Sequence, residues 1–261
     1  MSKLRELTDT EYIENGQIYC KKCNKPKSFE WEGKFIYYRC ECELAEKERL
    51  EQEPREKEYN RLTLIATKNH IASLKTLSNM GDKYRNVSFE TSEHIEEHKK
   101  CIKYCNNAVE NYKQGNGLYL YGLYGRGKTH TLACILNNLS EQLFTPFFTT
   151  FNAVFTEIKS TYSFDNKRTE EDIYKFYTKD VEFLFIDDLG TEYISERDNG
   201  IKKVIFNIIN DRLNNTMPII FSSNLSIKQL VPAGIDERVM WRIKESCKGN
   251  VIPFNGKNFR A

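Results

Sequence analysis

The fold is decided by the stretch Gly122-Leu123-Tyr124-Gly125-Arg126-Gly127-Lys128-Thr129, which matches G-x-x-x-x-G-K-[ST] at every fixed position. A short apolar run (118–121) precedes it and a helical pattern (128–143) follows it. The glycines let successive backbone N–H groups point at phosphate oxygens, and the start of the helix adds its positive dipole end. The stretch therefore predicts a phosphate-binding loop, in which Lys128 contacts the β- and γ-phosphates and Thr129 holds Mg²⁺.

Polar side chains follow two further apolar runs. Asp187 and Asp188 come directly after 183–186, and Asn224 follows 219–222. We expect Asp187 to hold Mg²⁺ directly or through water, Asp188 to polarise an attacking water, and Asn224 to reach that water or the γ-phosphate. Exposed turn residues are the alternative for all three. The predicted nucleotide and magnesium site comprises Gly122, Gly125, Arg126, Gly127, Lys128, Thr129, His130 and Asp187.

The rest of the C-terminal half alternates between strands and helices. Strands are predicted at 118–121, 147–150, 183–186, 219–222 and 251–254, and helices at 128–143, 153–162, 170–177 and 201–213. Upstream, 80–86 is predicted to be a loop and 92–114 one helix that ends at Gly115. The alternation predicts an α/β protein with a mostly parallel, doubly wound sheet.

Composition excludes several classes of protein. The 261 residues carry 39 Lys and Arg against 37 Asp and Glu, so the net charge is only +2, which argues against a basic coat for DNA. No apolar run is long enough to span a membrane, and the first residues lack the apolar core of a signal peptide. These features predict a cytoplasmic protein without a membrane partner.

Four of the eight cysteines fall into two close pairs, Cys20 with Cys23 and Cys40 with Cys42. Four thiolates at such spacing are the ligands of a tetrahedral zinc site, which can hold together a segment with little core. An iron–sulfur cluster and four unrelated free cysteines are the alternatives.

The other cysteines have weaker spacing. Cys134 and Cys247 are predicted to be small buried or half-buried residues. Four side chains at intervals of 4, 3 and 4 could share one helical face and bind a metal, or they could be ordinary residues of a helix surface: His94, His98, Cys101 and Cys105.

A charge-dense run (41–61) follows the paired cysteines and predicts a solvated helix or linker that breaks near Pro54. We therefore expect three parts: a zinc-binding module (1–45), a charged helical linker (46–79) and a nucleotide-binding domain (80–261).

At these motifs the sequence resembles the AAA+ ATPases, and more narrowly the DnaC/DnaI-like helicase loaders of bacteria and phages. The strings that carry this resemblance are 122–129, 183–190, 222–224 and 236–243, the last reading Asp-Glu-Arg-Val-Met-Trp-Arg-Ile. The resemblance implies that Arg242 is an arginine finger that acts on the nucleotide of a neighbouring subunit, supported by Arg238. Because 19 residues follow Arg242, we expect no helical lid.

The resemblance also implies a function. The chain would be a weak ATPase, with ATP, Mg²⁺ and Zn²⁺ as cofactors, that loads a DnaB-type helicase onto single-stranded DNA in replication initiation. It would bind the helicase through its zinc module and assemble into a ring or open spiral, a hexamer with the helicase. Lys159 and Tyr162 are the predicted DNA contacts, with an ordinary helix surface as the alternative. An IstB-like transposition helper and a non-hydrolysing adaptor or inhibitor of host replication proteins are the alternative functions.

Overall fold

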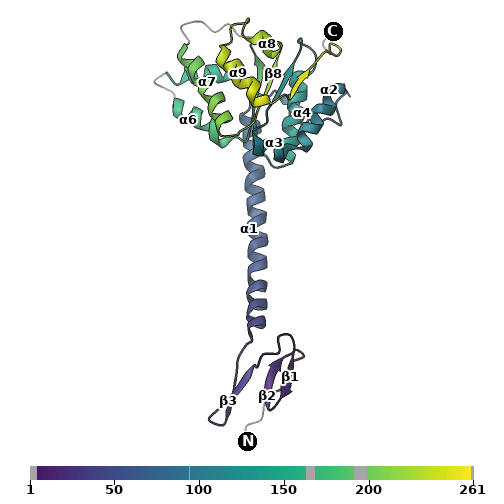
Figure 1. Ribbon diagram of the computed structural model, residues 1–261, viewed down its shortest axis with the longest axis vertical. Helices are drawn as coiled ribbons and strands as arrows, with labels where there is room; N and C mark the ends of the chain where they lie inside the picture. Colours follow the sequence, from purple (N-terminus) through teal and green to yellow (C-terminus); the bar gives the residue numbers. More distant parts are fainter. Residues whose placement is uncertain (1–4, 94, 163–167, 191–198, 260–261) are drawn as a thin grey trace. The chain divides into compact units, whose positions relative to one another are not determined.

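The structure is a computed structural model that describes residues 5–93, 95–162, 168–190 and 199–259. The chain divides into two compact units, Met1–Ala66 and Thr67–Ala261 (Figure 1). No helix among the described residues combines the length and apolar character needed to cross a membrane.

The first unit contains two antiparallel hairpins and a helix. Strands β1 (Glu11–Glu14) and β2 (Gln17–Cys20) pair through a two-residue turn, as do β3 (Ser28–Trp31) and β4 (Lys34–Tyr37). The Asn-Gly and Glu-Gly turns between them suit the twist of short hairpins. The apolar interior of this unit is small, since the buried hydrophobic residues in its described part (5–66) are Ile18, Cys20 and Cys40.

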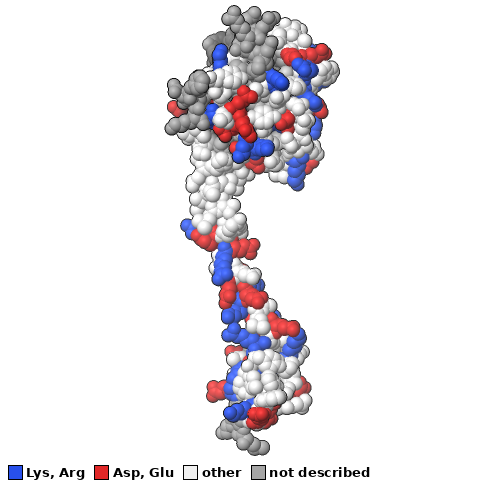
Figure 2. Space-filling model, turned by 90° about the vertical axis from the view of Figure 1, so that its left-hand side faces the viewer, with Lys and Arg blue, Asp and Glu red and all other residues white. Residues whose placement is uncertain are grey.

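Helix α1 (Glu41–Leu77) runs through the charged segment without a break, so the break predicted near Pro54 is wrong. A proline removes one backbone hydrogen bond, but Leu50, whose carbonyl loses its partner, is 58% exposed, so water can hydrate that carbonyl. Figure 2 shows Lys/Arg and Asp/Glu side chains interspersed on the N-terminal part of this helix, and ion pairs such as Lys47–Glu51 and Arg49–Glu46 follow helical spacing.

The second unit is built on a five-stranded sheet in the order β6-β7-β8-β5-β9, with every neighbouring pair parallel. This confirms the predicted mostly parallel sheet. The strands are β5 (Leu118–Tyr121), β6 (Pro146–Thr150), β7 (Phe183–Leu189), β8 (Ile219–Ser223) and β9 (Val251–Pro253). Four of them are almost wholly buried, as expected for a parallel sheet covered on both faces.

Helices cover both faces of this sheet (Figure 1). One apolar cluster joins the sheet to α2 (Glu96–Asn106), α3 (Ala108–Gln114) and α4 (Lys128–Glu141). The other joins it to α5 (Phe151–Ser160), α6 (Glu170–Lys175), the π-helical turn η2 (Phe176–Asp180), α7 (Asn199–Asn214), α8 (Ile227–Leu230) and α9 (Glu237–Cys247). The sheet is thus the middle of three layers.

Two local predictions are corrected. The single helix expected at 92–114 is two helices, because Asn107 adopts a non-helical conformation and its side-chain amide donates to the Lys103 carbonyl at 2.9 Å. The loop expected at 80–86 contains a short 3₁₀ turn, η1 (Asp82–Tyr84). The predicted end at Gly115 is confirmed by its left-handed conformation after α3.

Candidate nucleotide-binding site and cysteine cluster

The loop Gly122–Thr129 connects β5 to α4, as the motif predicts. Glycine is required at Gly122, because a Cβ there would lie 2.3 Å from the carbonyl oxygen of Phe254. Gly125 has a φ of +78°, which other residues rarely adopt. The loop therefore curls as a phosphate-binding loop does, at the start of a buried helix.

Lys128 is buried and its ammonium group lies at the centre of the loop. It donates to the carbonyls of Gly122 and Leu123 at 2.6 and 3.0 Å, and to Oδ1 of Asn224 at 2.9 Å. The predicted lysine and the predicted asparagine are thus in direct contact. A cation held in this way is positioned to meet a phosphate that approaches the loop.

Thr129 and Asp187 also meet, since the threonine hydroxyl donates to Oδ2 of Asp187 at 2.8 Å. Ser222, at the end of β8, donates to the other carboxylate oxygen. Burial raises the pKa of Asp187, while the hydrogen bonds from Ser222 and Thr129 oppose that rise. A hydroxyl beside a carboxylate offers two hard oxygen ligands, so this pair is suited to Mg²⁺.

Asp188 has a different environment from Asp187. It lies in an irregularity of the β7–β8 pairing, with a φ of +56°, and its side chain is exposed. Its backbone N–H donates to Oγ of Ser222 at 3.3 Å. The bulge turns two consecutive aspartates in different directions, one towards Thr129 and one towards the pocket.

The pocket beside the loop has a volume of about 620 Å³. The predicted residues Gly125, Arg126, Gly127, Lys128, Thr129, His130, Asp188 and Asn224 line it. Burial lowers the pKa of His130, and its Nε2 lies 2.6 Å from Oγ of Ser92. The neutral imidazole of His130 therefore forms part of the pocket wall and can hydrogen-bond there.

Other lining residues were missed by sequence reasoning: Lys83, Tyr84, Thr91, Ser92, Glu93, Ile95, His98, Tyr124 and Phe259. Most come from the segment before α2 and from the end of the described chain, which carry no local motif. Ser222 had a detectable signal, because it belongs to the same polar end of β8 that pointed to Asn224.

Arg238 and Arg242 are on α9 and are not among the described residues that line this pocket. Arg238 pairs with Asp236 at 2.9 Å, and Arg242 pairs with Glu245 at 3.0 Å. Their side chains are exposed by 78% and 36%, so both are accessible to a second molecule.

Lys159 and Tyr162 were expected on one helix. The helix α5 ends at Ser160, so Lys159 lies in its last turn and Tyr162 in the turn that follows. The Lys159 ammonium lies 5.7 Å from the Phe155 ring centroid, and the Tyr162 hydroxyl donates to Glu170 at 3.3 Å. Their role in binding DNA stays a prediction.

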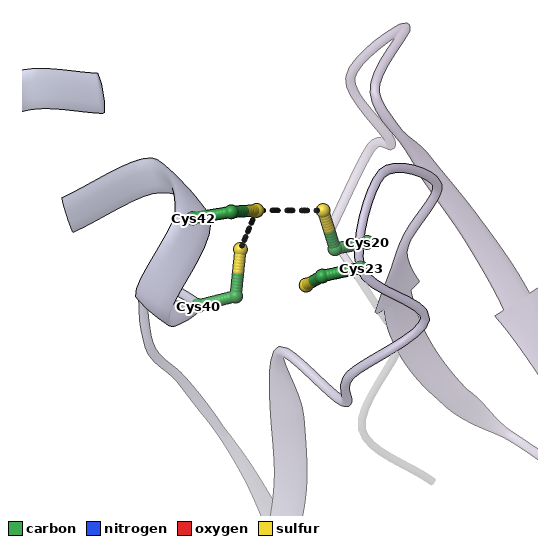
Figure 3. Close-up of side chains that lie close together, drawn as sticks. All are labelled: Cys20, Cys23, Cys40 and Cys42. Carbon is green, nitrogen blue, oxygen red and sulfur yellow. Dashed lines mark hydrogen bonds between the residues drawn. The ribbon is translucent and has the colours of Figure 1, made fainter. Parts of the chain in front are cut away.

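The four paired cysteines come together in the first unit (Figure 3). Cys20 and Cys23 lie at the end of β2 and in the turn after it, while Cys40 and Cys42 lie at the start of α1. All four Sγ atoms are within 4.8 Å of one another. A tetrahedral zinc–thiolate site needs sulfurs about 3.8 Å apart, so the cluster fits one zinc ion.

The other cysteines are all buried, as predicted for Cys134 and Cys247. Cys101 and Cys105 belong to the apolar cluster around α4 and do not form a half-exposed helix surface. His98 is buried, with Nε2 3.1 Å from the Thr131 hydroxyl, and His94 lies outside the described residues. In the described part of the chain, the His98–Cys105 face therefore does not form a group of converging metal ligands.

The loop, the acidic strand end and the five-stranded parallel sheet define the class: the second unit is an α/β P-loop domain of the AAA+ type. Residues 97–248 match the family of bacterial DnaA ATPase domains, and the chain belongs to that family.

Individual relatives confirm the resemblance to the DnaC/DnaI-like loaders. The replicative helicase loader DnaI of Bacillus subtilis is 34% identical over 119 residues, which cover 45% of this chain and 36% of that protein. The replicative helicase loader DnaC of Buchnera aphidicola is 30% identical over 142 residues, covering 53% and 55%. A crystal structure of DnaI superposes with a TM-score of 0.55 at 26% identity, covering 70% of this chain and 95% of that one. The alignments thus span about a third to a half of these two curated proteins.

Proposed function

We propose that this chain is an ATP-dependent loader that places a DnaB-type replicative helicase on single-stranded DNA. The observation that carries the proposal is the convergence of Lys128, Thr129, Asp187, Asp188 and Asn224 at the carboxyl edge of one parallel sheet. We infer the helicase as partner from the names of the relatives, which are replicative helicase loaders.

ATP binds with its phosphates in the loop Gly122–Thr129, where they compete with backbone carbonyls for the Lys128 ammonium. Thr129 and Asp187 would hold Mg²⁺, which would neutralise charge on the phosphates. Asp188 orients the attacking water, and Asn224 contacts that water or the γ-phosphate. Because such catalysis consists of positioning and charge stabilisation, a site that lacks one cation turns over slowly.

A neighbouring subunit supplies the missing cation. Arg242 is accessible on α9 and is absent from the described lining of its own pocket. A guanidinium is always charged and offers a planar fork to phosphate oxygens. Assembly into a ring or spiral therefore activates hydrolysis, with Arg238 as the supporting residue.

The first unit is the helicase-binding module, and Zn²⁺ on Cys20, Cys23, Cys40 and Cys42 stabilises it. Its small apolar interior gives it little stability without the metal. Loss of zinc is therefore expected to unfold this unit and to abolish helicase binding. Metal analysis of the purified full chain tests the first point: one zinc per chain is expected, and a Cys40→Ser variant should lose it. Iron in place of zinc would contradict the assignment.

The function is tested with the purified full chain and the replicative helicase encoded in the same genome or by its host. We expect a complex that survives gel filtration, ATPase activity that rises with helicase and single-stranded DNA, and helicase transferred to circular single-stranded DNA. An Asp188→Asn chain should still bind the helicase but should not complete the cycle of ATP hydrolysis and helicase transfer. ATP binding without stimulated turnover, together with normal behaviour of Asp188→Asn, would favour an adaptor. Binding to a transposase and not to the helicase would favour a transposition helper.

A further inference from the structure

Phe259, at the end of the segment Asn255–Phe259 that follows the edge strand β9, lines the nucleotide pocket. The segment lies against the phosphate-binding loop. The backbone N–H of Phe259 donates to the carbonyl of Gly125 at 2.8 Å. A Cβ on Gly125 would lie 2.0 Å from Oδ1 of Asn258, and a Cβ on Gly127 would lie 3.5 Å from the Phe259 ring. The two segments are therefore packed closely.

The same segment also contacts Glu93, just before α2, and Glu97, in the first turn of α2. Lys257 pairs with Glu93 at 2.5 Å, and the backbone N–H of Asn255 lies 3.4 Å from a carboxylate oxygen of Glu97. The Lys257 ammonium also lies 5.0 Å from the centroid of the Phe259 ring. Because Glu93 and Phe259 both line the pocket, these contacts connect two parts of its lining that lie far apart in the chain.

Phe259 nevertheless keeps 42% of its surface exposed, and Tyr84, Ile95 and Tyr124 line the same pocket. The charged and amide groups of the pocket include Lys128, Asp188 and Asn224. An aromatic face offers nothing to an anionic phosphate, whereas it packs well on a planar base or a ribose. A bound nucleoside would cover this exposed ring.

We propose that Phe259 contacts the nucleoside end of the bound nucleotide, and that the Lys257–Glu93 pair positions it. The proposal rests on the ATP binding proposed above and adds a residue that sets nucleotide affinity.

Calorimetric titration of the full chain with ADP and with inorganic tripolyphosphate tests this proposal. Phe259→Ala should weaken ADP binding by about five- to tenfold and leave tripolyphosphate binding within twofold of wild type. Phe259→Tyr should restore ADP binding. Tyr59→Ala, which removes an aromatic side chain that is 70% exposed and outside the pocket lining, serves as the matched control and should not change either affinity.

The positioning pair is tested by charge reversal. Lys257→Glu and Glu93→Lys should each weaken ADP binding by about two- to threefold, as expected for an exposed pair, and the double variant should recover most of the loss. Recovery would show that the two residues act through their pairing, and unchanged tripolyphosphate affinity in both single variants would distinguish positioning of Phe259 from structural support of the phosphate-binding loop.

The outcomes separate the two proposals. If the wild-type chain binds neither ADP nor ATP, the proposed function fails. If the wild type binds ADP and Phe259→Ala binds it equally well, only the present inference is overturned. An equal loss of ADP and tripolyphosphate affinity would also overturn it, because the segment would then support the loop without touching the nucleoside.

Discussion

The Lys128 ammonium and Oδ1 of Asn224 lie 2.9 Å apart although 96 residues separate them in the chain. The contact links the phosphate-binding loop to the end of the neighbouring strand β8. A nucleotide that draws Lys128 towards its phosphates therefore also acts on Asn224. The two residues should differ in what they contribute, since a cation attracts phosphate in every state and an amide contributes most where charge develops.

We expect Lys128→Ala to lower ATP affinity by at least about 100-fold, and Asn224→Ala to lower turnover by about 10-fold with little change in affinity. Calorimetry and a steady-state phosphate-release assay measure the two effects. Asn215→Ala, which removes an exposed amide after α7, is the control. Equal loss of affinity in both site variants would show that Asn224 serves only to hold the lysine.

Asp187 and Asp188 should also differ in their contributions to Mg²⁺ binding and to turnover. Asp187 is buried against Thr129, so Asp187→Asn should raise the Mg²⁺ concentration needed for half-maximal nucleotide binding by about 10-fold or more. Asp188→Asn should leave that concentration unchanged and lower turnover by at least about 100-fold. Magnesium titrations of nucleotide binding and of turnover measure both. If Asp188→Asn raised the Mg²⁺ requirement and Asp187→Asn lowered only turnover, the roles of the two aspartates would be exchanged.

Arg242 should act on a neighbouring molecule. Arg242→Ala and Asp188→Asn chains should each be nearly inactive alone, with turnover reduced at least about 100-fold. Mixing them should recover part of the activity, because a mixed assembly contains sites with an intact Asp188 and an intact neighbouring Arg242. Lys244→Ala, on the same helix, is the control. Absence of recovery in mixtures that demonstrably co-assemble would place Arg242 outside the site.

The sequence predicted the elements whose signals are local. The strand 118–121 and the start of α4 at Lys128 were located to the residue, because a buried parallel strand is a short apolar run and the glycine motif marks the helix start. The predictions at Pro54 and Asn107 were wrong for different reasons. At Pro54 the helix continues because water can hydrate the carbonyl that loses its partner. At Asn107 the helix ends because the side-chain amide donates to the Lys103 carbonyl. The pocket wall formed by Phe259 depends on the return of a distant segment, which no local pattern encodes.

Acid should destabilise the first unit through Glu11. Its buried carboxylate accepts hydrogen bonds from Arg5 at 2.7 and 2.9 Å and also contacts Lys27, and these partners hold its pKa well below the usual value of 4.5. A depressed folded-state pKa means that the stabilisation is complete above the unfolded-state pKa and disappears as the pH falls through the folded-state value. Stability should therefore fall below about pH 4.5. Release of the proposed zinc ion by protonation of its four cysteines would add a separate loss.

A Glu11→Gln variant isolates the contribution of the Glu11 carboxylate to stability. The variant and the wild type have the same cysteines, so protonation of these cysteines affects both equally. At neutral pH the variant should be less stable by about 2 kcal/mol or more, since it leaves Arg5 and Lys27 without their anion. Hydrogen exchange of β1 and β2, compared at equal pH, measures the difference. The gap should narrow as the pH falls below 4.5, and a gap that stays constant down to pH 3 would contradict the assignment.

Arg212 should be the residue of the second unit most sensitive to substitution. It is fully buried, and its guanidinium donates to the carbonyls of Tyr177, Val181, Glu182 and Pro218 at 2.7 to 3.0 Å. These carbonyls lie in η2 and just before β7 and β8, so the Arg212 side chain holds the first residues of two central strands in place. Burial lowers its pKa to about 9, and four hydrogen bonds offset the cost of burying the charge.

Arg212→Met keeps the length of the side chain but leaves these carbonyls without their donor, which should cost about 3–5 kcal/mol and lower the Tm by about 10 °C. Arg85→Met removes an exposed arginine paired at 2.7 Å with Asp82 and should change the Tm by less than about 2 °C. Thermal unfolding followed by circular dichroism compares them. Nucleotide affinity of the folded Arg212→Met chain should stay near wild type, because Arg212 fastens the ends of β7 and β8 that lie opposite the phosphate-binding loop. Equal stability of the two variants would mean that water replaces the guanidinium.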